Sequence, residues 1–195
     1  VERAADPAQR AVAIAELREG IERTRHLVER LLQLARVGPD AAPPGQGQDE
    51  VDLAVLVRDC VSRFSARAEA DGVDLGATSQ AAPRIHGDAH QLGILLDNLV
   101  DNALRQVPRG GRIDVAALRV GDSPALCVTD NGPGIPAPER GRVFDRFYRG
   151  QGAVGYGSGL GLAIVRAVAQ RHGAQVTLED APGGGLKVSV TFPAG

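Results

Sequence analysis

The N-terminal part of the chain carries a heptad pattern that restricts how it can fold. Asp6-Pro7 is typical of a helix start and Gly38-Pro39 of a helix end. Because a single helix cannot bury an apolar stripe alone, we expect a partner helix from elsewhere in the protein or from a second copy. Packing of the helix on its own domain is the alternative. The stripe follows spacings of three and four and consists of Ile14, Leu17, Ile21, Thr24, Val28, Leu31 and Ala35.

A stretch rich in Pro, Gly and Gln follows this helix and predicts a linker. We therefore expect three parts: a helical part over residues 1–37, a linker over 38–50 and a second domain over 51–195. The chain begins without Met, which suggests a fragment of a longer protein.

Composition excludes several classes of protein. The formal net charge is −2, so no broad basic surface is available for nucleic acid. No apolar run reaches the roughly 18 residues that a membrane span requires. Cys60 and Cys127 lie in apolar stretches and fit no metal-binding spacing, so we expect two buried thiols in a reducing compartment.

The second domain interleaves helices with hairpins. The patterns predict helices over 53–70, 88–107 and 160–172, and strands over 73–75, 83–85, 112–118, 125–129, 175–179 and 186–192. Asp88 is placed to cap the second helix, with Gln91 at the third helical position. This order favours an α+β two-layer sandwich of a mixed sheet and about three helices, and argues against a regular βαβ array.

Three polar residues share one face of the helix over 88–107. Asn98, Asn102 and Arg105 are spaced at i, i+4 and i+7, opposite a leucine-rich face. Amide oxygens can ligate Mg²⁺ and arginine can bind phosphate, so the stripe suits a metal–phosphate ligand. A solvated polar stripe is the equally weighted alternative.

Two glycine-containing segments are candidate ligand-binding loops. Asp130 stands at the end of a predicted strand, before the turn 131–136, where a carboxylate could accept a hydrogen bond from an exocyclic amine such as that of adenine. The segment 155–162 runs directly into a helix, where free backbone N–H groups favour anions. Each segment alone is also consistent with an ordinary turn or loop.

An aromatic and basic segment lies between these two loops. Residues 143–150 (VFDRFYRG) hold two of the chain's four Phe and one of its two Tyr, close to several arginines. Such a segment suits a mobile lid over phosphates. A surface loop held down by its two Phe side chains is the alternative.

Together, in this order, the four segments resemble the histidine kinase-like ATPase superfamily, and within it the sensor histidine kinases. Residues 98–105 (NLVDNALR) are similar to the N box of this family, 130–134 (DNGPG) to its G1 box, 144–148 (FDRFY) to its F box and 157–162 (GSGLGL) to its G2 box. The N-terminal helix resembles the second helix of the family's dimerisation and phosphotransfer domain, preceded by the end of the first helix.

The resemblance implies a site for ATP and Mg²⁺. Asn98 and Asn102 would hold the metal, Asp130 would bind the adenine amine, and Phe144 would belong to the lid. The ATP-binding residues implied are Asn98, Asn102, Arg105, Asp130, Gly132, Gly134, Ile135, Arg146, Phe147, Gly157, Ser158, Gly159, Leu160, Gly161 and Leu162.

The same resemblance implies phosphoryl transfer to a protein side chain. Superfamily members that hydrolyse ATP carry Glu at the position of Asn98, and an amide cannot act as a general base. The acceptor His would lie upstream of this chain, since His26 lacks the acceptor motif, so no catalytic residue is assigned here. The phosphoryl group would then pass to an Asp of a response regulator.

The whole protein would be a homodimer through its helical domain. The family places this part in the cytoplasm, on a parent protein anchored in the bacterial inner membrane by upstream segments, and nucleic acid is not an expected partner. Gln106-Val107 departs from the family, which has an aromatic residue followed by Ser or Thr, and puts one side of the nucleotide pocket in doubt. This departure keeps a nucleotide-binding pseudo-kinase as an alternative. An anti-sigma-type Ser kinase on the same fold is a second alternative, disfavoured by the heptad helix and the linker, and an ATPase clamp is disfavoured by Asn98.

Overall fold

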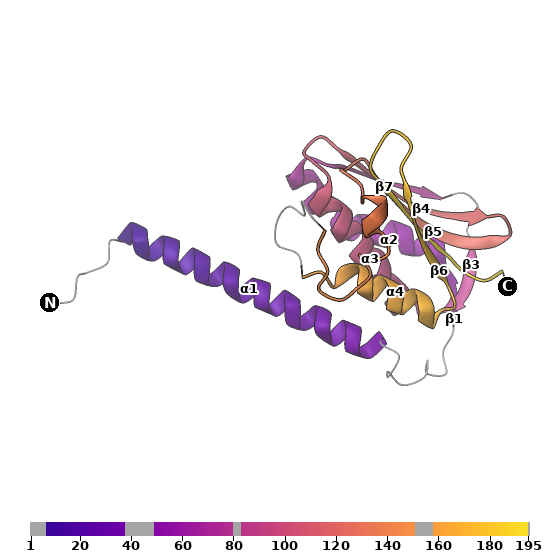
Figure 1. Cartoon of the computed structure of the whole chain (residues 1–195), viewed down its shortest axis with the longest axis horizontal. Helices are drawn as coiled ribbons and strands as arrows, with labels where there is room; N and C mark the ends of the chain where they lie inside the picture. Colours follow the sequence, from indigo (N-terminus) through magenta and orange to yellow (C-terminus); the bar gives the residue numbers. More distant parts are fainter. Residues whose placement is uncertain (1–6, 38–48, 80–82, 151–157, 195) are drawn as a thin grey trace.

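The computed structural model describes residues 7–37, 49–79, 83–150 and 158–194. Within these ranges a long helix is followed by an α+β domain (Figure 1). The predicted linker over 38–50 falls largely outside the described residues. Residues 1–4, expected to end the first helix of the helical domain, also lie outside them.

The predicted N-terminal helix is confirmed as α1 (Pro7–Val37). Its C-terminal end lies beside α4 (Gly161–Arg171), where Leu34 is only 5% exposed. The rest of the helix extends away from the domain (Figure 1). Most of the predicted apolar stripe is therefore exposed, including Ile14, Leu17, Ile21, Val28 and Leu31.

A five-stranded mixed sheet forms one layer of the domain. The strands lie in the order β2 (Asp74–Ser79), β4 (Arg112–Val120), β5 (Ser123–Asp130), β7 (Leu186–Thr191) and β6 (Gln175–Asp180). Only β2 and β4 are parallel; the other neighbours are antiparallel. The connection between β2 and β4 is long and contains α3, as a parallel pair requires.

Three helices form the second layer, which confirms the predicted α+β sandwich. They are α2 (Leu53–Asp71), α3 (Ala89–Gln106) and α4, and they contact strands from β2 to β6. Alternate strand residues meet them in the core, because successive side chains of a strand point to opposite faces. The buried apolar strand residues on this face include Ile113, Val115, Ala117, Leu126, Val128, Leu186, Val188 and Val190.

A separate two-stranded sheet differs from the sequence-based expectation. β1 (Asp49–Asp52) pairs with β3 (Arg84–Gly87) in antiparallel register. β1 begins at Asp49, whereas the sequence placed the start of the domain at Val51. Its four residues include three acidic ones, so the strand is formed by pairing with β3 and not by local propensity.

The start of α3 is fixed by the Asp88 cap and by a hydrogen bond to His172. The side chain of Asp88 accepts a hydrogen bond from the backbone N–H of Gln91 at 3.1 Å, as predicted for the cap. The side-chain amide of Gln91 donates to the other oxygen of the same carboxylate. The backbone N–H of Asp88 donates to Nε2 of His172 at 3.1 Å and not to the side chain of Gln91. Because His172 Nδ1 lies 2.8 Å from the carbonyl of Val168, Nδ1 carries the proton and Nε2 is the acceptor. The hydrogen bond to His172 ties the start of α3 to the end of α4.

Two further sequence-based expectations concern the cysteines and the membrane. Cys60 and Cys127 are free thiols and both are buried, as predicted. Burial and the neighbouring Asp97 raise the pKa of the Cys60 thiol, so it stays protonated. In the described ranges, no helix combines the length and apolar character needed to cross a membrane.

We predict that Gly185→Ala destabilises the domain far more than Gly183→Ala. Both glycines have positive φ, which costs an L-residue about 1–2 kcal/mol. At Gly183 a Cβ would meet nothing within 4 Å, whereas at Gly185 it would lie 2.0 Å from the Asp130 carbonyl oxygen. We expect Gly185→Ala to lower the free energy of unfolding by about 3 kcal/mol or more. Urea denaturation of both variants measures this, and equal losses would show that the close approach is unimportant.

Candidate functional site

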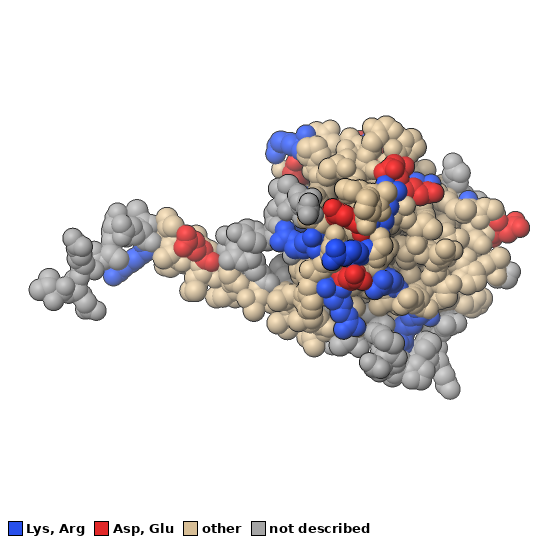
Figure 2. All heavy atoms as spheres, viewed as in Figure 1, with Lys and Arg blue, Asp and Glu red and all other residues tan. Residues whose placement is uncertain are grey.

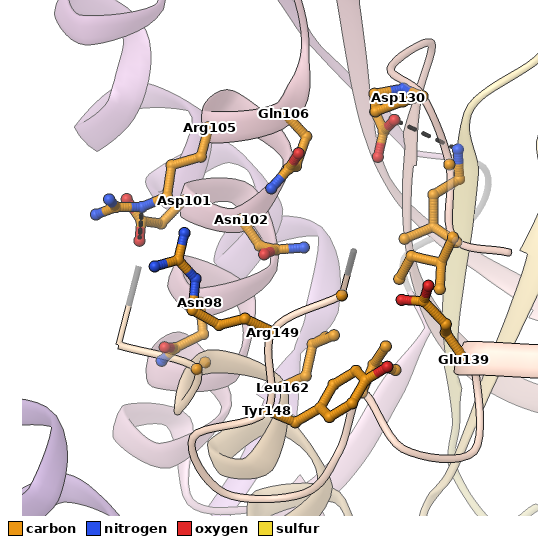
Figure 3. A pocket seen from close by; sticks show the side chains of 18 of the residues that line it. Asn98, Asp101, Asn102, Arg105, Gln106, Asp130, Glu139, Tyr148, Arg149 and Leu162 are labelled. Carbon is orange, nitrogen blue, oxygen red and sulfur yellow. Dashed lines mark hydrogen bonds and ion pairs between the residues drawn. The ribbon is translucent and has the colours of Figure 1, made fainter. Parts of the chain in front are cut away.

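A cavity of about 380 Å³ lies between α3, the turn after β5 and the start of α4. Figure 3 shows its side chains converging from α3 on one side and from the β5 end and the loop before α4 on the other. It is lined by Asn98, Asp101, Asn102, Arg105, Gln106, Asp130, Pro133, Gly134, Ile135, Pro136, Glu139, Val143, Tyr148, Arg149, Gly150, Ser158, Gly159, Gly161, Leu162 and Leu186.

The predicted polar stripe of α3 faces this cavity. Asn98, Asn102 and Arg105 all line it, while the opposite face of the helix is buried in the core. Asn98 is only 7% exposed, and its Nδ2 donates to the carbonyl of Ile94 at 2.8 Å. Because that carbonyl can only accept, the amide nitrogen is held against the helix and Oδ1 is left as an acceptor for a ligand.

Asp101 also lines the cavity, which the sequence analysis did not anticipate. Its Oδ1 lies 2.6 Å from a guanidinium nitrogen of Arg67 on α2, and its Oδ2 lies 3.1 Å from Nε of Arg105. The spacing of Asp101 and Arg105 at i, i+4 was a signal for the second pair. The first pair joins two helices, so no local pattern reveals it.

Asp130 is placed at the cavity by the alternation of β5. It lies on the same side of the sheet as Val128, facing the helices, and is 7% exposed. Its Oδ1 accepts from the backbone N–H groups of Gly132 at 2.9 Å and Leu186 at 3.3 Å. Both bonds fall on one oxygen, which leaves Oδ2 for a ligand. Burial raises the pKa of the Asp130 carboxyl, and the two backbone donors partly oppose this effect.

The turn after Asp130 forms the adjoining wall. Gly134 and Ile135 line the cavity as expected, together with two prolines of the same turn. Gly132 does not line it and acts through its N–H on Asp130. A Cβ on Gly132 would lie 3.0 Å from Asp130 Oδ1 and 3.4 Å from the Gln106 carbonyl oxygen, so this glycine lets the turn approach the end of α3.

The loop before α4 contributes different residues from those expected. Tyr148, Arg149 and Gly150 line the cavity, whereas Arg146 and Phe147 do not. Phe147 is 60% exposed and has a φ of 65°, a strained value for an aromatic residue. Its backbone N–H donates to the carbonyl of Gly159 at 3.0 Å, which ties the loop to the glycine segment.

Two arginines hold the aromatic residues of this loop. Arg142 stacks over Tyr148 at 4.6 Å from the ring centroid, and Arg166 of α4 lies 5.6 Å from that of Phe144. Basic and acidic side chains are intermingled over this face of the molecule (Figure 2). These contacts anchor part of the loop. The alternative of a loop held down by both Phe side chains fits Phe144 but not the exposed Phe147, and the lid over phosphates stays a prediction.

The glycine segment leads into α4 without a side-chain cap. Leu160, at the N-cap position, is fully buried in the core and makes no capping hydrogen bond. Ser158, Gly159, Gly161 and Leu162 line the cavity. The first backbone N–H groups of α4 are thus not satisfied by a capping side chain, and the helix dipole favours an anion there. Gly157, also expected at the site, lies outside the described residues.

Gln106 and Val107, the two positions that differ from the family pattern, have different surroundings in the structure. Gln106 lines the cavity at the end of α3, on the side of Asn102 (Figure 3). Val107 is buried and lies against Gly111, where an added Cβ would be 2.2 Å from the valine Cγ1. Only Gln106 can therefore contact a ligand directly, and Val107 is a packing residue.

Comparison with known proteins agrees with this geometry. Residues 87–195 match the family of histidine kinase-, DNA gyrase B-, and HSP90-like ATPases. The sensor protein QseC of Escherichia coli K12 is 35% identical over 188 residues, which are 96% of this chain and 40% of QseC. The chain thus spans less than half the length of this curated relative.

Solved structures show the same relationship. A mycobacterial sensor histidine kinase, MprB, has a TM-score of 0.66 at 32% identity and covers 75% of this chain and 97% of its own. Full-length ShkA in complex with AMPPNP has a TM-score of 0.76 at 28% identity, covering 99% of this chain and 41% of its own. The chain therefore belongs to the histidine kinase-, DNA gyrase B-, and HSP90-like ATPase family, and the relatives it resembles are sensor histidine kinases.

Proposed function

We propose that the cavity binds Mg-ATP and that the chain is the catalytic part of a sensor histidine kinase. The observation that carries this proposal is the convergence on one cavity of two asparagines, Arg105, the buried Asp130 and the uncapped start of α4. This set matches the parts of a nucleotide: an acceptor for the base amine, and amides, a cation and free N–H groups for phosphates. The structure of ShkA, which matches 99% of this chain, was solved in complex with AMPPNP.

The two asparagines are the residues that fit Mg²⁺. Oδ1 of Asn98 is oriented as an acceptor, and Asn102 lies one turn further along the same face of α3. The described part of the chain contains no group of three His, Cys, Asp or Glu residues suited to a metal. Mg²⁺ prefers oxygen ligands and retains several water molecules, so we expect it to bind here only together with the phosphates of a nucleotide. Bound Mg²⁺ would supply charge neutralisation on the phosphates.

The side chains around the phosphates favour transfer to a protein group over hydrolysis. Asn98 is an amide and cannot take a proton from water. Asp101 is held in pairs with Arg67 and Arg105, and Glu139 lies on the wall across from α3 (Figure 3). The γ-phosphoryl group would pass from ATP to an imidazole nitrogen, with the P–O bond to ADP breaking as the P–N bond forms. Positioning and charge neutralisation supply the catalysis.

The remaining parts of the proposal concern the whole protein. Residues 1–37 would belong to the helical dimerisation and phosphotransfer domain, whose exposed stripe on α1 pairs with helices outside this chain. The acceptor His would lie on such a helix, and a response regulator would receive the phosphoryl group. The parent protein would be anchored in the bacterial inner membrane, with this domain in the cytoplasm.

The phosphotransfer proposal is tested in the longer protein that contains this chain. Incubation with ATP labelled at the γ-phosphate should give an acid-labile, base-stable phosphohistidine on the protein. Rapid release of inorganic phosphate without labelled protein would contradict a kinase and favour an ATPase.

We predict that Asp130→Asn weakens nucleotide binding without destabilising the domain at neutral pH. The amide oxygen of the new Asn must accept the hydrogen bonds from the backbone N–H groups of Gly132 and Leu186. The amide N–H₂ then points toward the adenine amine, and two donors face each other. Loss of a charged hydrogen bond costs about 1.5–3 kcal/mol, so the Kd for ATP should rise at least about tenfold. Titration calorimetry measures the affinity, and unchanged affinity would exclude Asp130 as the base-binding residue.

The same variant yields a prediction for pH. Because burial raises the pKa of the Asp130 carboxyl in the folded chain, the ionised group disfavours folding relative to the protonated group. The protonated Asp130 therefore favours folding at a pH below the pKa of this group in the unfolded chain. This contribution is lost as the pH rises through the higher pKa of the folded chain. We expect Asp130→Asn to melt at or above the wild-type temperature at neutral pH, and this advantage to shrink as the pH falls through the carboxyl range. A stability difference independent of pH would contradict the shift.

We predict that Asn102→Leu removes most of the Mg²⁺ dependence of ATP binding. The substitution keeps the size of the side chain but deletes the amide oxygen that can ligate the metal. The Kd for Mg-ATP should rise at least about tenfold, while the Kd for ATP in EDTA and for adenosine should change little. Equal weakening of all three ligands would point to a damaged fold instead.

A further inference from the structure

Two ion pairs of matching geometry join α2 to α3. Arg63 lies 2.5 Å from Asp97, and one turn further along both helices Arg67 lies 2.6 Å from Asp101. Both pairs bring an arginine of α2 to an aspartate of α3 across the same helix interface. The two pairs differ in the other contacts that the aspartate makes. This difference indicates that one pair has a role besides joining the helices.

Only the second pair reaches the cavity. The side chain of Asp97 is 37% exposed and does not line the cavity, whereas that of Asp101 is 12% exposed and does. Asp101 also divides its two oxygens, with Oδ1 toward Arg67 and Oδ2 toward Arg105. Arg67 itself does not line the cavity. The pair therefore connects a residue outside the cavity with a cation inside it.

This arrangement limits where Arg105 can go. A free arginine samples many rotamers, and ordering it on binding reduces affinity. Contact with Asp101 restricts the guanidinium of Arg105 before any ligand arrives. Arg67 also lies 3.6 Å from Asp71 on its own helix, so two guanidinium groups and two carboxylates balance in charge, and Asp101 shares its own charge between Arg67 and Arg105. Without Arg67, Asp101 loses one of its two cationic partners and draws Arg105 more strongly to itself, away from an anionic ligand.

We propose that Arg67, through Asp101, is a positioning residue that sets Arg105 for the phosphates of the nucleotide. This inference rests on the proposed function of the cavity as a Mg-ATP site. It implies that Arg67, although outside the cavity, increases the affinity for the phosphates of the nucleotide and not the affinity for the nucleoside.

The test compares Arg67→Gln with the matched control Arg63→Gln in the full chain. Titration calorimetry gives the Kd of each variant for adenosine, ADP and ATP in the presence of Mg²⁺. We expect Arg67→Gln to raise the Kd for ATP about 3- to 10-fold, the cost of ordering one side chain, with a smaller rise for ADP and none for adenosine. Arg63→Gln should leave all three unchanged, and Arg67→Lys, which keeps the charge, should bind ATP nearly as the wild type does.

Three results would overturn the inference. Equal loss of ATP affinity in Arg67→Gln and Arg63→Gln would show a general effect of the helix interface. Weakening of adenosine as much as ATP would show a damaged pocket, and unchanged ATP affinity would show that Arg67 has no part in binding. If the wild-type chain bound neither adenosine nor ATP, the proposed function itself would fail, and the inference with it.

Discussion

The packing of α3 on the sheet is the constraint on which the site depends. The buried side chains of this helix include Leu92, Leu95, Leu96 and Leu99, and burying each contributes about 1.5–3 kcal/mol. With these side chains fixed in the core, a period of 3.6 residues turns Asn98, Asn102 and Arg105 toward the cavity. The caps of Asp88 and His172 set where the helix begins, and therefore how far along it these side chains lie.

The opposite wall depends on close backbone approach. The turn after Asp130 packs against the hairpin between β6 and β7, where Gly134 and Gly185 meet with no room for a side chain. The same packing brings the N–H of Leu186 to the Asp130 carboxylate. A carboxylate that is buried and held on one oxygen leaves the other for a ligand, and its raised pKa is the electrostatic cost of that position.

Regular elements allowed much of this site to be predicted from sequence. Helical periodicity placed the polar stripe of α3 on one face, and strand alternation with a following glycine turn placed Asp130 at the end of β5. The residues that were missed depend on contacts between elements. Asp101 is explained by Arg67 on another helix, and the strand β1 by its pairing with β3.

The irregular loop before α4 was the least predictable part. Because its residues have no periodicity, no local pattern favours Tyr148 and Arg149 over Arg146 and Phe147 as cavity residues. Their placement follows from the hydrogen bond between Phe147 and Gly159 and from the stacking of Arg142 on Tyr148. The apolar stripe of α1 was predictable from its heptads, and its pairing with a further helix stays a prediction.

The central claim is that the cavity beside α3 is the nucleotide site. Its most direct test is a two-dimensional amide NMR spectrum of the wild-type chain, recorded with and without Mg-AMPPNP. The account predicts shifts of the backbone signals of Gly132, Gly159, Gly161 and Leu162 and of the side-chain amides of Asn98 and Asn102. A spectrum unchanged by the nucleotide, or shifts confined to α1 and the far end of the sheet, would contradict it.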